Sequence, residues 1–180
     1  MLETLAKNIW ILLTLVMPGL FTYGAWRAIL LLEPSGRVAV DALAQIDNSV
    51  LATSSIIVAI ALLQQAIAIV IEAALTLLAK IMKKQWPNFH ALFCDRFELA
   101  ASGKLNENAT RVIANFFMSI NMSIGLSLLL LYCLAYEEMQ LTQWVPLSLI
   151  ILLAATLTTA AFRMINAKWV IKECKRKHQL

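Results

Sequence analysis

Charged residues are scarce in this chain. Only 14% of its 180 residues are Asp, Glu, Lys or Arg, whereas 61% are hydrophobic. Soluble domains carry about 25% charged and about 45 to 50% apolar residues, because their surfaces face water. With five glycines and four prolines, the composition is not that of a collagen-like or disordered chain either. It therefore excludes an ordinary water-soluble enzyme.

The residue patterns that usually carry chemistry are also missing. Cysteine occurs three times, an odd number, and two of the three, Cys94 and Cys174, fall in regions predicted below to face the reducing cytoplasm, so no disulfide framework is expected. The sequence has no Gly-rich phosphate loop, no convincing repeat and no Ser-His-Asp or Cys-His grouping with a recognisable context. We expect a non-enzymatic protein without a resident cofactor or metal.

Four long uncharged stretches are present instead. They run from Asn8 to Trp26, Asn48 to Ile71, Val112 to Tyr136 and Met139 to Phe162. A helix rises about 1.5 Å per residue, so about 20 apolar residues cross a hydrocarbon core of about 30 Å. None of the stretches alternates polar with apolar residues as a half-buried strand would. The sequence predicts an all-α integral membrane protein with spans at about residues 8–31, 49–80, 111–136 and 141–163.

The positions of Lys and Arg predict the orientation of these spans. All of them except Arg27 and Arg37 lie near the N-terminus, in the loop from Lys80 to Arg111, or in the tail from Arg163 onward. Basic residues are retained on the cytoplasmic side during insertion, so both termini should be cytoplasmic. A multi-pass protein of the cell membrane follows, in a bacterium the inner membrane. The net charge of +4 is explained by the same rule, and direct contact with nucleic acid is not expected.

Two cytoplasmic elements stand out. The loop over residues 86–108 contains a predicted amphipathic helix from Asn88 to Ala101, with a stop at Ser102-Gly103, and the fourth span is expected to continue as a helix through the basic tail, residues 164–180. Together they predict a cytoplasmic docking surface of basic and aromatic residues, which we call the basic platform. Its residues are Lys83, Lys84, Trp86, Arg96, Trp169, Lys172, Lys175, Arg176 and Lys177.

Polar residues recur inside the spans. Gln65 and Glu72 lie seven residues apart on a face of the second span that is rich in small side chains, which indicates that this face contacts protein. An intramembrane carboxylate is costly, so Glu72 should pair with Arg163, line an ion site, or be protonated and hydrogen-bonded. The whole set, which we call the polar row, comprises Gln65, Glu72, Asn115, Ser119, Asn121, Ser123 and Arg163. Its third-span serines, four residues apart, suit either helix packing or the lining of a channel.

One group of residues has metal-ligand spacing. His90 with Cys94, and Cys174 with His178, are both i, i+4 pairs on predicted cytoplasmic helices, and together they would form a tetrahedral Cys2His2 site if the helices met. Such pairs are common by chance, and a packed Cys94 with a solvated tail is the simpler interpretation.

These patterns favour a homo-oligomeric membrane anchor or sensor that docks a cytoplasmic protein through the basic platform. The lipid bilayer and further copies of the chain are its other expected partners. A small oligomeric ion channel lined by the polar residues of spans two and three is one alternative. An accessory subunit of a larger membrane complex is another.

Overall fold

The structure, a computed structural model, describes residues 2–32, 49–85, 87–135 and 144–178; for residues 2–13, Leu15, Leu32, Asn88 and His178 it describes the backbone but not the side chain. Every regular element in these ranges is a helix, and they contain no strand. The all-α prediction is therefore confirmed for the described part of the chain.

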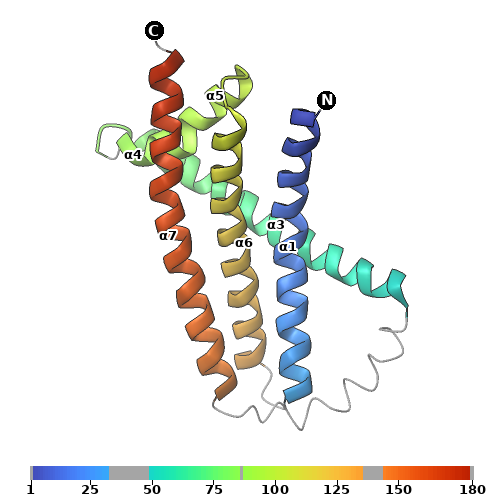
Figure 1. Cartoon of the computed structure of the whole chain (residues 1–180). Coiled ribbons are helices and arrows are strands. Elements are labelled where there is room, and N and C mark those ends of the chain that lie inside the picture. The colour runs from blue at the N-terminus through green and yellow to red at the C-terminus, as the bar shows by residue number, and fades with distance from the viewer. Residues whose placement is uncertain (1, 33–48, 86, 136–143, 179–180) are drawn as a thin grey trace.

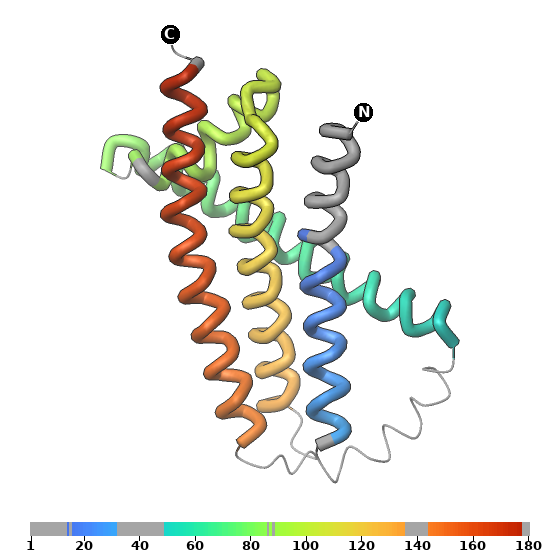
Figure 2. Tube along the Cα trace, viewed as in Figure 1, coloured from blue at the N-terminus to red at the C-terminus, as the bar shows by residue number. Residues whose placement is uncertain are grey.

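Three long helices lie side by side and a fourth crosses them. Helices α1 (Leu2–Leu32), α6 (Glu107–Ala135) and α7 (Trp144–His178) run roughly along one direction, with α6 between the other two, and α3 (Val50–Ile81) crosses behind them at a steep angle (Figure 1). The start of α1 and the end of α7 lie at the same end of the bundle (Figure 1). Figure 2 shows residues 87–101 at this end, beside the last turns of α7. We call this end the charged end.

Three described helices, α3, α6 and α7, are long and apolar enough to cross a membrane. They differ in burial: 44% of the most apolar stretch of α6 is buried inside the protein, against 17% in α3 and in α7. Because α6 touches neighbours on both sides, it is the central helix of the fold. The outer faces of α3 and α7 carry exposed large apolar residues such as Leu62, Val70 and Ile151, as expected for helices in contact with acyl chains.

Helix α1 continues through Pro18, which is fully buried. At the next residue, Gly19, the backbones of α1 and α3 lie close together. A Cβ at this position would lie 2.6 Å from the Cβ of Ala61 and 2.8 Å from the carbonyl oxygen of Ile57. Small residues on both helices therefore allow α3 to cross α1 directly, backbone against backbone.

Between α3 and α6 the chain forms one helical segment of three parts. These are α4 (Pro87–His90), the π-helical turn η2 (Ala91–Asp95) and α5 (Arg96–Ala101), which together cover the predicted helix from Asn88 to Ala101. The segment ends as expected at Ser102-Gly103, where Gly103 takes a left-handed φ of 67° and the N–H of Lys104 donates to the carbonyl of Leu99. We call residues 87–101 the connecting segment.

Candidate functional site

At the centre of the bundle, α3 is held to α1 by a buried side-chain hydrogen bond. The Nε2 of Gln64 donates to the Oγ1 of Thr22 at 2.6 Å, and Gln64 is only 1% exposed. Gly125 of α6 leaves the space for this pair, because a Cβ there would collide with both side chains. The spacing of small residues on the second span predicted that Gln65 faces protein, but it did not indicate the same for Gln64.

Gln65, the predicted member of the polar row, contacts α6 instead of α1. Its Oε1 accepts a hydrogen bond of 3.0 Å from the Nδ2 of Asn121. Two adjacent glutamines thus reach two different helices, because α3 crosses the bundle obliquely and both sides of it meet protein at this level. The remaining amide oxygens, on Gln64 and Asn121, are buried and have no hydrogen-bond partner in the described part of the chain.

The other face of α6 is joined to α7 by polar contacts. The Oγ of Ser123 donates to the Oγ1 of Thr156 at 3.0 Å. One turn further toward the charged end, the Nη1 of Arg163 donates to the carbonyl oxygen of Asn115 and to the Oγ of Ser119, both at 2.8 Å. Ser119 and Ser123 of α6 therefore hydrogen-bond to α7 here, and Arg163 finds one backbone and one side-chain acceptor on α6.

Glu72 has a different partner from the expected one. Its Oε1 forms an ion pair with the Nη2 of Arg96 in α5, so the predicted pairing with Arg163 is wrong. The sequence showed how deep Glu72 lies on α3, but it could not show that the connecting segment folds back far enough for Arg96 to reach it.

Arg96 is enclosed on all sides. Its guanidinium lies 4.5 Å from the ring centroid of Phe97 and 4.2 Å from that of Phe117 in α6, while the residue as a whole is 9% exposed. Burial lowers the pKa of Arg96 to about 10, so it stays charged at neutral pH. The assignment of Arg96 to an exposed basic platform is therefore corrected: this residue joins α5 to α3 and α6 from within.

The preceding residue, Asp95, joins the same segment to α7. Its Oδ2 lies 3.0 Å from the Nζ of Lys175, and its Oδ1 lies 3.3 Å from the Nδ1 of His90. Adjacent residues of an ordinary helix point about 100° apart, but η2 widens the backbone immediately before Arg96 and leaves both Asp95 and Arg96 buried. We call Asp95 and Arg96, with their partners Lys175 and Glu72, the ionic clasp.

An apolar cluster lies beneath the clasp. It contains fully buried Leu92 of η2, Ala109 of α6, and Ala167 and Ile171 of α7, with Phe89 and Cys94 packed at its edge. The connecting segment and the last turns of α7 are therefore packed as one unit. This contact could not be read from the sequence.

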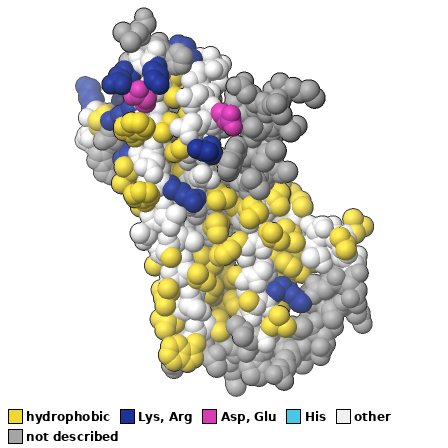
Figure 3. All heavy atoms as spheres, in the orientation of Figure 1, with side chains coloured by type: hydrophobic (Ala, Val, Ile, Leu, Met, Phe, Trp, Pro, Cys, Tyr) yellow, Lys and Arg dark blue, Asp and Glu magenta, His cyan; other side chains and the backbone are white. Residues whose placement is uncertain are grey.

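The basic surface lies over this unit. Lys83, Lys84, Lys172, Arg176 and Lys177 are exposed, Trp169 is 68% exposed, and Lys175 is partly exposed beside Asp95. Figure 3 shows Lys and Arg side chains gathered at the charged end, above a surface on which hydrophobic side chains prevail. Trp86, the remaining member of the basic platform, lies outside the described residues.

The arrangement gives no support to a zinc site. His90 faces Asp95, and burial raises the pKa of the Cys94 thiol, which disfavours the thiolate that a metal requires. Cys174 is buried in the apolar cluster, and the side chain of His178 lies outside the described residues. No group of three metal-ligating side chains occurs among the residues that the structure describes.

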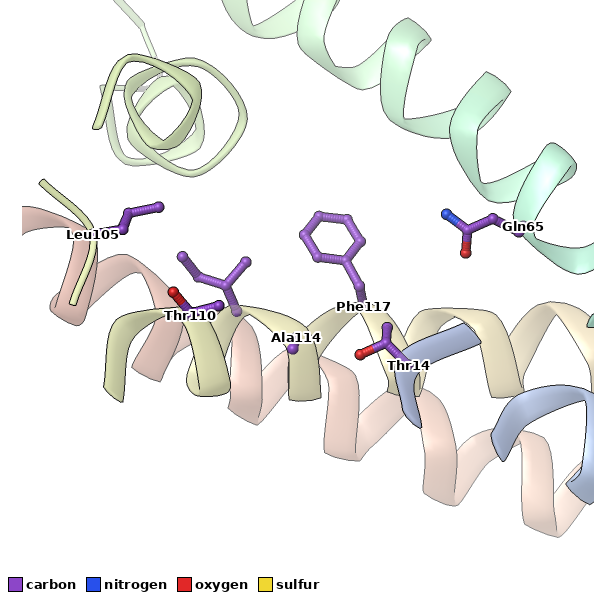
Figure 4. Close-up of a pocket in the computed structure, with 7 residues that line it drawn as sticks. Thr14, Gln65, Leu105, Thr110, Ala114 and Phe117 are labelled. Carbon is purple, nitrogen blue, oxygen red and sulfur yellow. The ribbon is translucent and has the colours of Figure 1, made fainter. Parts of the chain in front are cut away.

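A groove of about 430 Å³ opens along α6 near the charged end. Figure 4 shows Leu105 and Phe117 pointing into it, with Gln65 of α3 and Thr14 of α1 at the other end. Most of its lining is apolar, and its wall includes the ring of Phe117 on which Arg96 lies.

Comparison with protein-family models, with curated proteins and with solved structures finds no match to this chain. What the protein does must therefore be inferred from its own geometry.

Proposed function

We propose that the chain is a non-enzymatic, multi-pass protein of the cell membrane, in a bacterium the inner membrane, that docks a cytoplasmic protein through the basic platform. In this proposal α1 is the fourth span beside α3, α6 and α7. Its support is the uncharged run within α1 and the close packing of that helix against α3 at Gly19.

The direction of the proposed insertion rests on charge. The charged end holds the loop and tail in which Lys and Arg are concentrated, and it also holds the start of α1 and the end of α7. An even number of spans with both ends on one side agrees with this arrangement. By the positive-inside rule the charged end faces the cytoplasm.

One observation carries the docking proposal: the ion pair between Asp95 and Lys175 over the shared apolar cluster. It joins the connecting segment, which follows Lys83 and Lys84 in the sequence, to the basic end of α7, and packed side chains support this junction. A loop whose basic residues serve only to orient the protein during insertion does not need to be packed against another segment. On a rigid basic surface the charged groups keep fixed positions, so a partner can be selected by the arrangement of its acidic groups as well as by its net charge.

The chemistry of that surface favours an acidic protein partner. Exposed Lys172 and Arg176 follow the exposed Trp169 by three and seven residues on α7, a spacing that places them on one face of the helix. Aromatic and Arg side chains are enriched at protein interfaces. Association with an acidic partner would be steered by charge and would weaken as salt is raised.

Photo-crosslinking in living cells tests this function. A benzoylphenylalanine at Lys83 and one at Lys172 should both capture the same protein, while the same group at lipid-facing Ile151 should not. Reversal of charge at Lys172, Arg176 and Lys177 to Glu, or deletion of residues 168–180, should abolish capture but leave membrane insertion intact. Different adducts at Lys83 and Lys172, or capture unchanged by charge reversal, would contradict the proposal.

An oligomeric channel is the alternative that the polar row suggests. The amide oxygens of Gln64 and Asn121 that have no partner among the described residues favour it, since a pore would supply water to them. The bonds from Asn121 to Gln65 and from Ser123 to Thr156 weigh against it, because they use these side chains within one chain. Conductance in planar bilayers that changes selectivity in Glu72→Gln would establish the channel.

We also propose that the chain associates with other membrane proteins, either with further copies of itself or as a subunit of a larger complex. The exposed apolar faces of α3 and α7 offer surfaces for either. Mass measurement of the detergent-solubilised protein separates them: a single defined multimer supports the homo-oligomer, whereas a polydisperse sample supports an accessory subunit that lacks its complex.

A further inference from the structure

The groove along α6 is lined by residues that recur with helical spacing. Thr110, Ile113, Ala114 and Phe117 follow one another at intervals of three, one and three, so they lie on one face of the helix, and Leu105 from the preceding loop extends this lining. The volume of about 430 Å³ falls within the range of about 300 to 1,000 Å³ that is usual for small-molecule sites.

The lining determines what can occupy the groove. Its surface is almost entirely apolar in the stretch between Leu105 and Phe117, so water gains few hydrogen bonds there. From Thr110 to Phe117 the helix rises about 10 Å, and half of a hydrocarbon core is about 15 Å. An acyl chain that enters from the charged end and runs toward the centre of the bundle therefore fits both the chemistry and the length.

The end of the groove at Leu105 and Thr110, which we call its mouth, is flanked in the sequence by a net positive charge. Lys104 precedes Leu105 and Arg111 follows Thr110, and both are exposed; Glu107 is the acidic residue between them. Within the described residues, the side chain of Arg111 donates one hydrogen bond, of 3.0 Å, to the Oδ1 of Asn108. A phosphate at this mouth would find Arg and Lys donors, which form charge-assisted hydrogen bonds with phosphate oxygens.

We propose that this groove is a phospholipid site, in which one acyl chain lies against Ala114 and Phe117 and the phosphate lies at Lys104 and Arg111. The proposal rests on the membrane placement argued above, but not on the docking of a protein. It assigns a ligand to a surface that the docking function does not use.

The site would also communicate with the ionic clasp. Phe117 lines the groove and lies under the guanidinium of Arg96, which in turn pairs with Glu72. A chain packed against Phe117 restricts the motion of that ring, and so restrains Arg96 and the connecting segment. Lipid occupancy is therefore expected to increase protection of amides 96–101 from hydrogen exchange.

The test uses the full chain in nanodiscs of phosphatidylcholine that contain a trace of phosphatidylglycerol with a diazirine on one acyl chain. After irradiation, the label should be found on residues 105–117. Ala114→Phe fills the groove and should lower that labelling about tenfold, the change given by a loss of about 1.4 kcal/mol in affinity. Ala161→Phe, at an exposed position of α7, is the matched control and should leave it unchanged.

A second comparison tests the phosphate. Lys104→Gln with Arg111→Gln should weaken labelling by the phosphatidylglycerol probe but not by a diacylglycerol with the same diazirine. Loss of both signals, or of neither, would refute a phosphate contact at this mouth. If Ala114→Phe elutes as an aggregate, Ala114→Leu replaces it, with the same expected direction.

The proposal is overturned if residues 105–117 are labelled no more than the exposed face of α7, or if Ala114→Phe labels as strongly as the unmodified chain. Neither result would change the crosslinks expected at Lys83 and Lys172, so the lipid site and the docking function fail separately. Hydrogen exchange at residues 96–101 that does not respond to added phosphatidylglycerol would refute the connection to the clasp.

Discussion

The centre of the bundle and its charged end are held together by different interactions. At the centre, glycine and alanine bring helices into contact and single neutral hydrogen bonds, such as Gln64 to Thr22, join them. At the charged end, ion pairs lie over an apolar cluster. In the proposed membrane placement the centre lies in lipid, where apolar burial adds little to association, so close packing must hold it. At the charged end, where water is near, burial and charge can both contribute.

This difference determines which substitutions each region tolerates. Added volume should harm the centre, where there is no space for it, and loss of one charge should harm the charged end, where the partner would be left buried and unpaired.

Arg96→Leu should have the largest effect, because it leaves Glu72 without its partner. We expect a loss of about 3 kcal/mol in the free energy of unfolding, at the low end of the range for buried pairs, since the Glu72 side chain keeps 23% exposure. Lys84→Leu, at an exposed position, is the control and should change little. In the double variant with Glu72→Leu, part of the loss should be recovered; a double variant less stable than Arg96→Leu alone would show that the ion pair is not the cause.

Gly19→Ala should destabilise the centre by about 1 to 3 kcal/mol, because the added methyl group meets the backbone of α3, which cannot yield as a flexible side chain can. Gly24→Ala lies on the same helix with open space around it and should be neutral or slightly stabilising. Thermal unfolding in detergent compares the two variants. Equal behaviour of both would show that α3 does not cross α1 at Gly19.

Ser123→Ala should cost about 0.6 kcal/mol, the average for a hydrogen bond between membrane helices. Its partner is Thr156, so Thr156→Val should cost a similar amount and the double variant should cost less than the sum of the two. Strict additivity in this double-mutant cycle would argue that the bond contributes nothing to the contact between α6 and α7.

Lys175→Gln should have the smallest effect on stability, about 0.3 kcal/mol, near the low end of the range for exposed pairs, because its side chain is 39% exposed and the pair with Asp95 is screened by salt. The difference from the unmodified chain should shrink between low and high ionic strength. The effect of Arg96→Leu, by contrast, should be nearly independent of salt. The same salt dependence for both variants would remove the distinction between the two halves of the clasp.

The helical character of the chain could be predicted because long apolar runs leave few alternatives. The end of the connecting segment at Ser102-Gly103 was also predictable, since glycine favours the left-handed conformation that stops a helix. Helical periodicity along the second span correctly placed Gln65 against protein.

The partners could not be predicted, and the reasons are geometric. Because α3 crosses the bundle steeply, both Gln64 and Gln65 contact neighbouring helices. A pattern that assigns one inward face to a helix includes Gln65 but leaves out Gln64. The π-helical turn changes the periodicity just before Arg96, so a regular helix pattern does not show that Asp95 and Arg96 are both buried. For Glu72 the sequence offered Arg163 as the basic partner, and only the folding back of residues 87–101 brings Arg96 to it instead.

In the proposed topology, residues 80–111 and the end of α7 share the cytoplasmic side of the membrane. Single cysteines at Lys83, Trp144 and Lys177, in a chain with Cys94→Ala, Cys133→Ala and Cys174→Ala, test it with a membrane-impermeant maleimide. Lys83→Cys and Lys177→Cys should react only in inverted vesicles, and Trp144→Cys only in spheroplasts. Reaction of Lys83→Cys and Lys177→Cys from opposite sides, or of both from outside the cell, would contradict the account.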